Sequence, residues 1–262
     1  MLPSPGRLWL IPNLIAPGSP EAALPPATLD RVRTLRRFVV EAERAGWRFL
    51  SAILDRSALE LVEFSILDEH TAIEDVERLL APALAGEDLG LISEAGMPCI
   101  ADPGAPLVAL AHERGIRVIP LVGPSSILLA LAASGLDGQH FSFLGYLPSD
   151  REGRRTALRS IDRGITEDGA TRIFIEAPYR NDHLLEDCLA CLSPQTRLCV
   201  AKNIGSEDES ITQGRVSSLR TTHALIGKSP AIFLAGLVPG LARDRAPHPS
   251  NSHRKRTQEG VE

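Results

Sequence analysis

The sequence has few aromatic residues, which make up 4% of its 262 residues. Proteins that bind single-stranded nucleic acid by base stacking depend on such side chains, so this composition disfavours a stacking platform. The formal charge is −5 at pH 7, and a basic footprint over the whole molecule is therefore excluded. Any contact with nucleic acid has to come from a local basic patch.

Cysteine is also scarce, with four residues at irregular spacing. Secreted disulfide scaffolds need more cysteines in a regular framework, so this class is excluded. Cys188 and Cys191 form a CxxC pair inside a helical pattern, and no second pair completes a zinc set. We interpret both as small packing residues and predict no metal site.

Signals for export or membrane insertion are absent as well. The chain opens without a charged segment followed by a cleavage site, which predicts a cytoplasmic protein. Residues 118–136 carry no charge over about one membrane span, but Pro120 and the Gly123-Pro124 pair interrupt them. We therefore predict a strand, a turn and a buried helix there, and no membrane association.

Strand-like and helix-like segments alternate along the chain, which predicts an α/β protein with a mostly parallel sheet and helices on both faces. The glycine-rich stretch 135–140 suggests a boundary between domains at 1–137 and 138–242, followed by a disordered polar tail at 243–262. Strands are expected at 7–11, 59–64, 88–92, 117–122, 141–147, 171–177, 197–201 and 230–236. Helices are expected at 28–37, 48–54, 71–84, 106–114, 151–162 and 181–192.

The most unusual segment is SEAGMPCIADPG at 93–104, which directly follows an apolar strand. Its prolines and glycines predict a shaped loop rather than a helix or strand. Open α/β sheets bind ligands at the carboxyl ends of their strands, where this loop lies. It has neither GxGxxG nor a terminal Gly-Lys-Ser/Thr, so it does not predict a phosphate cradle.

Four segments occur in an order that resembles the tetrapyrrole-methylase superfamily of S-adenosylmethionine-dependent methyltransferases. They are SEAGMPCIADPG, GIRVIPLVGPSS, FSFLGYLP and IEAPYR. The resemblance is nearest to the branch that methylates a cytidine ribose 2′-hydroxyl in small-subunit ribosomal RNA. That branch carries a D-A-G-x-P-x-x-x-D-P-G loop, a P-G-P turn and an E-x-P-H-R segment. The similarity covers roughly residues 7–237.

This resemblance implies two α/β domains with S-adenosylmethionine in the inter-domain cleft, and a homodimer. Alignment with the family pattern implies that backbone groups of the shaped loop hold much of the cofactor. The residues implied to bind it are Gly96, Met97, Ile100, Ser125, Ser126, Glu176, Ala177, Ala201, Pro230 and Ala231.

The segments on the acceptor side depart from the branch. The family turn P-T-P-I-G-N becomes PNLIAP at 12–17, and A-E-D-T-R becomes VEAER at 40–44. A-R-E-L-T-K and K-G-E are similarly eroded, at 201–206 and 228–230. Glu41 matches the surviving acid and is the candidate base for a ribose hydroxyl, although a solvated helix residue is an equal alternative. Arg44, Tyr179 and Arg180 are candidates for orienting the acceptor.

A group of four arginines is relevant to RNA binding. Helical spacing predicts that Arg151, Arg154, Arg155 and Arg159 share one exposed face, where they would contact RNA phosphates or simply be solvated. The sequence thus predicts a methyltransferase acting on RNA ribose. A small heterocyclic or tetrapyrrole-like acceptor, and a cofactor-binding protein that has lost catalysis, stay open as alternatives.

Overall fold

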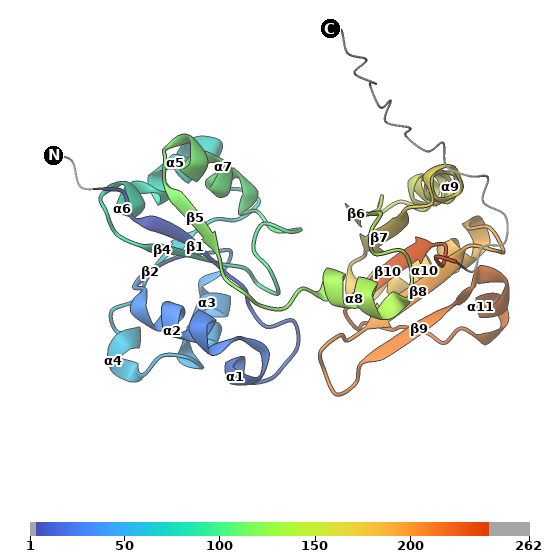
Figure 1. Ribbon diagram of the computed structural model, residues 1–262, viewed down its shortest axis with the longest axis horizontal. Helices are drawn as coiled ribbons and strands as arrows, with labels where there is room; N and C mark the ends of the chain where they lie inside the picture. Colours follow the sequence, from blue (N-terminus) through green and yellow to red (C-terminus); the bar gives the residue numbers. More distant parts are fainter. Residues whose placement is uncertain (1–3, 241–262) are drawn as a thin grey trace, which may run out of the picture.

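The computed structural model describes residues 4–240, which form two halves, each built on a five-stranded sheet (Figure 1). The tail expected to be disordered, 243–262, lies outside the described residues. Within them, none of the helices combines the length and apolar character that crossing a bilayer requires. The predicted α/β class is confirmed.

The sheet of the N-terminal half is parallel throughout, with the strand order β3-β2-β4-β1-β5. Its strands are β1 (Arg7–Ile11), β2 (Arg37–Val40), β3 (Glu63–Ile66), β4 (Leu89–Ile92) and β5 (Arg117–Pro120). The sequence prediction missed β2 by extending a helix to residue 37. It also expected a strand at 59–64, where α4 ends at Leu59 and β3 begins at Glu63.

Helices cover both faces of this sheet, as predicted. They are α1 (Pro20–Ala23), α2 (Pro26–Thr34), α3 (Glu43–Ser51), α4 (Arg56–Leu59), α5 (Ile73–Leu79), α6 (Ala81–Leu84) and α7 (Ala105–Glu113). Neighbouring residues of one strand point to opposite faces. Trp9 and Ile11 accordingly pack in the core beneath α2 and α3, while Leu8 packs in the core beneath α5 and α7.

The sheet of the C-terminal half is mixed, with the order β6-β7-β10-β8-β9. Its strands are β6 (Phe141–Tyr146), β7 (Thr171–Ile175), β8 (Arg197–Lys202), β9 (Ser210–Arg215) and β10 (Ala231–Gly236). β6 pairs parallel with β7, and the other pairs are antiparallel. The expectation of a mostly parallel sheet is therefore wrong for this half. β8 and β9 form a hairpin, for which no helical crossover is needed.

The second sheet is also covered on both faces, by α8 (Ser126–Ser134), α9 (Arg151–Asp168), η1 (Pro178–Arg180), α10 (Asn181–Cys191) and α11 (Val216–Thr222). α9, α10 and α11 enclose the core on one face, and α8 packs on β10, β8 and β9 from the other. The domain division at residue 137 stays a prediction, and this packing favours placing α8 with the second half.

Candidate functional site

Three connecting segments meet at one edge of the N-terminal sheet. They follow β1, β4 and β5, which are neighbours in the order β4-β1-β5. Because the strands are parallel, their carboxyl ends lie at the same edge, where open α/β sheets bind ligands. The segments are the turn 12–18, the shaped loop 93–104 and the turn 121–125.

The turn 12–18 and the shaped loop are joined through Asn13 and Gly96. The Asn13 N–H donates to the Gly96 carbonyl at 2.9 Å, and the Gly96 N–H donates to the Asn13 carbonyl at 3.1 Å. The buried Asn13 side chain also donates from Nδ2 to the carbonyls of Ser93 (2.9 Å) and Glu94 (3.2 Å). This role of Asn13 was not predicted from the sequence, in which the segment differs from the family turn.

The shaped loop has an unusual backbone. Gly96 lies at φ +70°, and Cys99 and Ala101 lie at +68° and +56°, a region that non-glycine residues rarely adopt. Asp102 stabilises this path, because its Oδ1 accepts hydrogen bonds from the N–H groups of Cys99 and Gly104. Non-glycine residues with positive φ are under backbone strain, and strained residues of this kind are concentrated at functional sites.

Gly96 also has close neighbours. A Cβ at this position would lie 3.3 Å from Ile15 Cγ2 and 3.5 Å from the carbonyl oxygen of Pro124.

The predicted cofactor residues Ser125 and Ser126 follow Pro124 directly. Ser125 is the N-cap of α8, and its hydroxyl accepts from the Leu128 N–H at 3.4 Å. Met97 is half-buried, and Ile100 is exposed.

The two halves approach each other through Ile15. A Cβ on Gly205, in the β8–β9 connection, would lie 3.3 Å from Ile15 Cδ1. Ile15 and Ile127 also pack against the core that α8 shares with the second sheet. The shaped loop and the second half therefore contact the same residue of the turn 12–18.

In the second half, Glu176 follows β7 and its side chain is 1% exposed. Its Oε1 accepts from the Ala177 N–H at 2.7 Å and from Arg180 Nη2 at 2.6 Å. Within residues 4–240, Glu176 Oε2 and Asn181 Oδ1 are buried without a hydrogen-bond partner. Tyr179 is 66% exposed, and its hydroxyl accepts from Arg180 Nη1.

The other predicted cofactor residues lie nearby, on β8 and β10. Ala201 is opposite Ile232 in the register, and Ala231 is opposite Lys202. Ala201 packs in the core beneath α8, while Ala231 packs in the core on the other face. Their side chains therefore lie on opposite faces of the sheet and do not line one surface together. Pro230 is exposed, and its carbonyl accepts from the Asn203 N–H.

The candidate base Glu41 directly follows β2 at the same sheet edge. Burial raises the pKa of its carboxyl, and the neighbouring Glu94 and Asp102 raise it further. Arg44 is exposed on the first turn of α3. A cleft of about 510 Å³ lies beside this edge, between the turn 13–18 and α3, and is lined by Arg48 and Glu94 among others.

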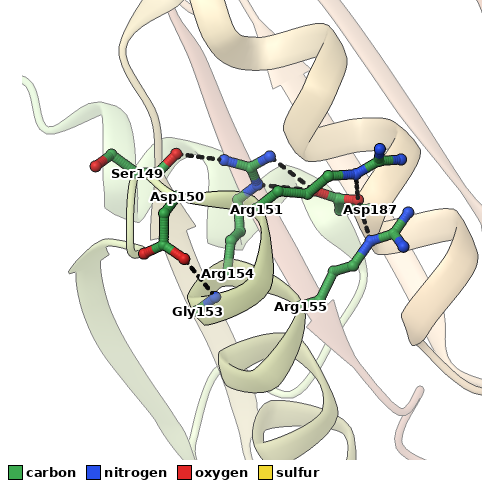
Figure 2. A network of polar contacts seen from close by, with 7 residues as sticks. All are labelled: Ser149, Asp150, Arg151, Gly153, Arg154, Arg155 and Asp187. Atoms are coloured by element: carbon green, nitrogen blue, oxygen red, sulfur yellow. Dashed lines mark hydrogen bonds and ion pairs between the residues drawn. The ribbon is translucent and has the colours of Figure 1, made fainter.

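The structure corrects the expected arginine face. Figure 2 shows that Arg151, Arg154 and Arg155 converge on Asp187 of α10 instead of pointing together into solvent. Arg154 is 5% exposed and donates twice to Asp187 Oδ2, at 2.9 and 2.7 Å. Arg155 donates to Oδ1 at 2.6 Å, and Arg151 Nε lies 3.6 Å from the same oxygen. Arg159 is exposed, as expected.

The four cysteines are buried or half-buried. All four lie within the described residues and are free thiols. Burial raises the pKa of Cys99 to about 11 and that of Cys188 further, so both thiols stay protonated near neutral pH. In the part of the chain that the structure describes, three or more His, Cys, Asp or Glu side chains are nowhere gathered to hold a metal ion.

Similarity to known proteins was found at the level of sequence and of fold. Ribosomal RNA small subunit methyltransferase I of Escherichia coli O157:H7 is 37% identical over 153 residues, which cover 58% of this chain and 52% of that protein. The protein of the same name from Mesorhizobium japonicum is 32% identical and covers 82% and 71%. The chain spans about half the length of several curated relatives that it matches, the first of these included.

A solved structure shares the fold. Uroporphyrin-III C-methyltransferase from Thermus thermophilus, complexed with S-adenosylhomocysteine, has a TM-score of 0.51 at 19% identity, with 89% of this chain and 98% of that chain covered. In addition, residues 27–220 match the model of the family described as Tetrapyrrole (Corrin/Porphyrin) Methylases. This match covers most of the chain, and the protein therefore belongs to the tetrapyrrole methylase family.

Proposed function

We propose that this protein is an S-adenosylmethionine-dependent methyltransferase whose acceptor is a ribose 2′-hydroxyl of RNA. The observation that carries the proposal is the meeting of three loops at the carboxyl ends of β4, β1 and β5, with Asn13 bonded to Gly96. Relatives at 32–38% identity named as ribosomal RNA methyltransferases support RNA as the acceptor.

The chemistry of this edge fits S-adenosylmethionine. The cofactor is a sulfonium cation with amino, carboxylate and adenine groups, so it needs hydrogen-bonding backbone and no phosphate nest. Gly96 supplies a backbone that a side chain would crowd, and the left-handed residues Cys99 and Ala101 keep the loop irregular. Within residues 4–240, the unpartnered buried oxygens of Glu176 and Asn181 are acceptors suited to an amino group.

We assign cofactor contacts to the shaped loop at Gly96, Met97 and Ile100, and to Ser125 and Ser126 at the start of α8. On the second half, Glu176 and Ala177 follow β7, and Pro230 offers backbone next to β10. The bound cofactor would supply an electrophilic methyl group. For Ala201 and Ala231 the assignment is restricted to their backbone, because their side chains belong to separate cores.

The remaining chemistry belongs to the acceptor. A ribose hydroxyl has to lose a proton as its oxygen attacks, and a carboxylate with a raised pKa is a suitable proton acceptor. Glu41 meets this requirement, since burial and the acidic neighbours raise its pKa. Positioning of the hydroxyl at about 3–3.5 Å from the methyl carbon supplies much of the acceleration. We assign that positioning to the cleft beside α3, with Arg44 and Arg48 on the same helix.

Two separate assays test the proposal. Calorimetry with S-adenosylhomocysteine is expected to give binding that survives EDTA, because no metal takes part in the assigned contacts. Methyl transfer is then measured with isotope-labelled S-adenosylmethionine and total RNA. Label that enters a small heterocyclic metabolite but not RNA would show that the acceptor is a small molecule. Cofactor binding without any methyl transfer would indicate that catalysis has been lost. The homodimer stays a prediction, which light scattering after size exclusion tests.

A further inference from the structure

A polar hollow of about 340 Å³ lies between the first turn of α9, η1 and the first turns of α10. Arg151, Arg154, Arg180 and His183 line it, together with Ser149 and the carboxylates of Glu186 and Asp187. We call it the arginine hollow. Sequence periodicity places Arg151 and Arg154 on an exposed helix face, either in contact with RNA phosphates or solvated, and it predicts no pocket there.

Asp187 organises the arginine hollow. Its side chain is 2% exposed, and it accepts from Arg154 and Arg155 while Arg151 lies within ion-pair distance (Figure 2). Burial alone would raise the pKa of this carboxyl, but the hydrogen bonds from Arg155 and Arg154 outweigh it and lower the pKa. Asp187 is therefore an anion near neutral pH, and it fixes the direction of the arginines.

The charges in and beside the hollow do not balance. Arg151 and Arg154 of the hollow and the adjoining Arg155 exceed Asp187 by two positive charges, and Glu186 in the lining offsets one of them. Arg180 is already paired with Glu176. One positive charge is thus left over even with a neutral His183. A phosphodiester carries one negative charge.

Free donors accompany this charge. A guanidinium has five N–H donors. Arg154 uses three of them, two on Asp187 and one from Nη1 to the Ser149 carbonyl at 3.0 Å. The Arg151 side chain is 68% exposed, and within residues 4–240 its guanidinium donates no hydrogen bond. Phosphate oxygens are the acceptors that best match several guanidinium donors.

The arginine hollow adjoins one of the proposed cofactor contacts. Arg180 lines the hollow, and its Nη2 donates to Glu176, which follows β7 in the second half. A phosphate in the hollow would therefore be one residue away from Glu176. Arg159, two turns further along α9, does not line the hollow.

We propose that the arginine hollow is a phosphate subsite that holds one backbone phosphodiester of the RNA acceptor, with Arg151, Arg180 and His183 as ligands. Arg154 contributes its remaining donors and, through Asp187, is held in place. This inference rests on the proposed function, since it assumes an RNA acceptor. It differs from the sequence prediction by replacing a diffuse basic face with one defined pocket.

The test compares Arg151→Gln with Arg163→Gln, a matched control in which an exposed arginine of the same helix outside the hollow is changed. Binding of a fluorescent single-stranded RNA oligonucleotide is measured by anisotropy over a range of salt concentrations. Arg151→Gln is expected to weaken binding about tenfold at low salt, the size of one charge-assisted contact. The slope of log affinity against log salt should fall by about 0.7, the value for one phosphate of a single strand.

The control and a rescue make the result decisive. Arg163→Gln should change neither affinity nor slope, and Arg151→Lys should retain most of the slope because it keeps the charge. Equal losses of RNA affinity in Arg151→Gln and Arg163→Gln, or no loss in either, would overturn the subsite. The proposed function would still stand in that case if the wild-type protein methylates RNA. A wild-type protein that binds no RNA would overturn both, and calorimetry with S-adenosylhomocysteine on each variant confirms that it is folded.

Discussion

Asn13 and Gly96 exchange both of their backbone hydrogen bonds, at 2.9 and 3.1 Å, although 82 residues separate them in the chain. This pair joins the turn after β1 to the shaped loop after β4. The loop's ability to present its backbone to a ligand therefore depends on a residue of another segment. The Asn13 side chain reinforces the contact by donating to two carbonyls of the loop.

Replacing Asn13 should loosen the shaped loop. Asn13→Ala leaves the carbonyls of Ser93 and Glu94 without their buried donor, which should destabilise the protein by about 1–3 kcal/mol. Affinity for S-adenosylhomocysteine should fall with it. Chemical denaturation and calorimetry measure the two effects. Asn13→Asp, which keeps the shape but not the donor, should lose at least as much stability and affinity. A stable Asn13→Ala variant with full affinity would show that the shaped loop does not depend on Asn13.

Gly96 allows a sharper comparison, because a matched glycine is available. Gly96 and Gly115 both lie at φ +70°, so alanine at either position pays a similar backbone cost of about 1–2 kcal/mol. A Cβ on Gly115 meets no atom within 4 Å, whereas one on Gly96 meets Ile15 and Pro124. Both variants should lose comparable stability, but only Gly96→Ala should lose cofactor affinity. Equal affinity in the two variants would remove Gly96 from the cofactor site.

Glu41→Gln should affect stability and activity in opposite directions. The folded pKa of Glu41 is raised, so the group favours folding below its unfolded pKa and opposes folding once pH rises above its folded pKa. At neutral pH, removing the charge should therefore raise Tm slightly. Methyl transfer should fall by about a hundredfold or more if Glu41 accepts the proton. A Glu41→Gln variant with normal kcat would show that Glu41 does not accept the proton.

Asp187→Asn tests the buried ionic cluster. Leaving Arg154 buried without its carboxylate should cost about 3–5 kcal/mol. Because the folded pKa of Asp187 is lowered, its contribution is present above the unfolded pKa of about 3.9 and is lost as pH falls through the folded value. Wild type and variant should therefore converge in stability in strong acid. Denaturant titrations from neutral pH to below pH 3 measure this, and a pH-independent difference would contradict it.

Local sequence signals predicted much of the first half. The alternation of apolar segments identified β1, β4 and β5, and the density of proline and glycine at 93–104 identified the shaped loop. β2 was missed because RFVV is short and the helical pattern before it extends through Arg37. β9 was missed because it is an edge strand with alternating exposed positions and few apolar residues.

Contacts between distant segments were beyond the reach of those signals. Helical spacing identifies residues that share a face, but it does not say what packs on that face. Asp187, 33 residues after Arg154, converts the expected solvated arginines into a buried cluster. The role of Asn13 depends in the same way on the loop beside it. Single-sequence patterns carry no information on such pairs, because their chemistry is determined by tertiary packing.

The product of methyl transfer tests the proposed function most directly. The protein is incubated with isotope-labelled S-adenosylmethionine and unmodified small-subunit ribosomal RNA, and the RNA is digested to nucleosides for mass spectrometry. We expect label in a 2′-O-methylated nucleoside, cytidine by family resemblance, and no label when that position is a 2′-deoxynucleotide. Label on a base, or on no nucleoside while S-adenosylhomocysteine still binds, would contradict it.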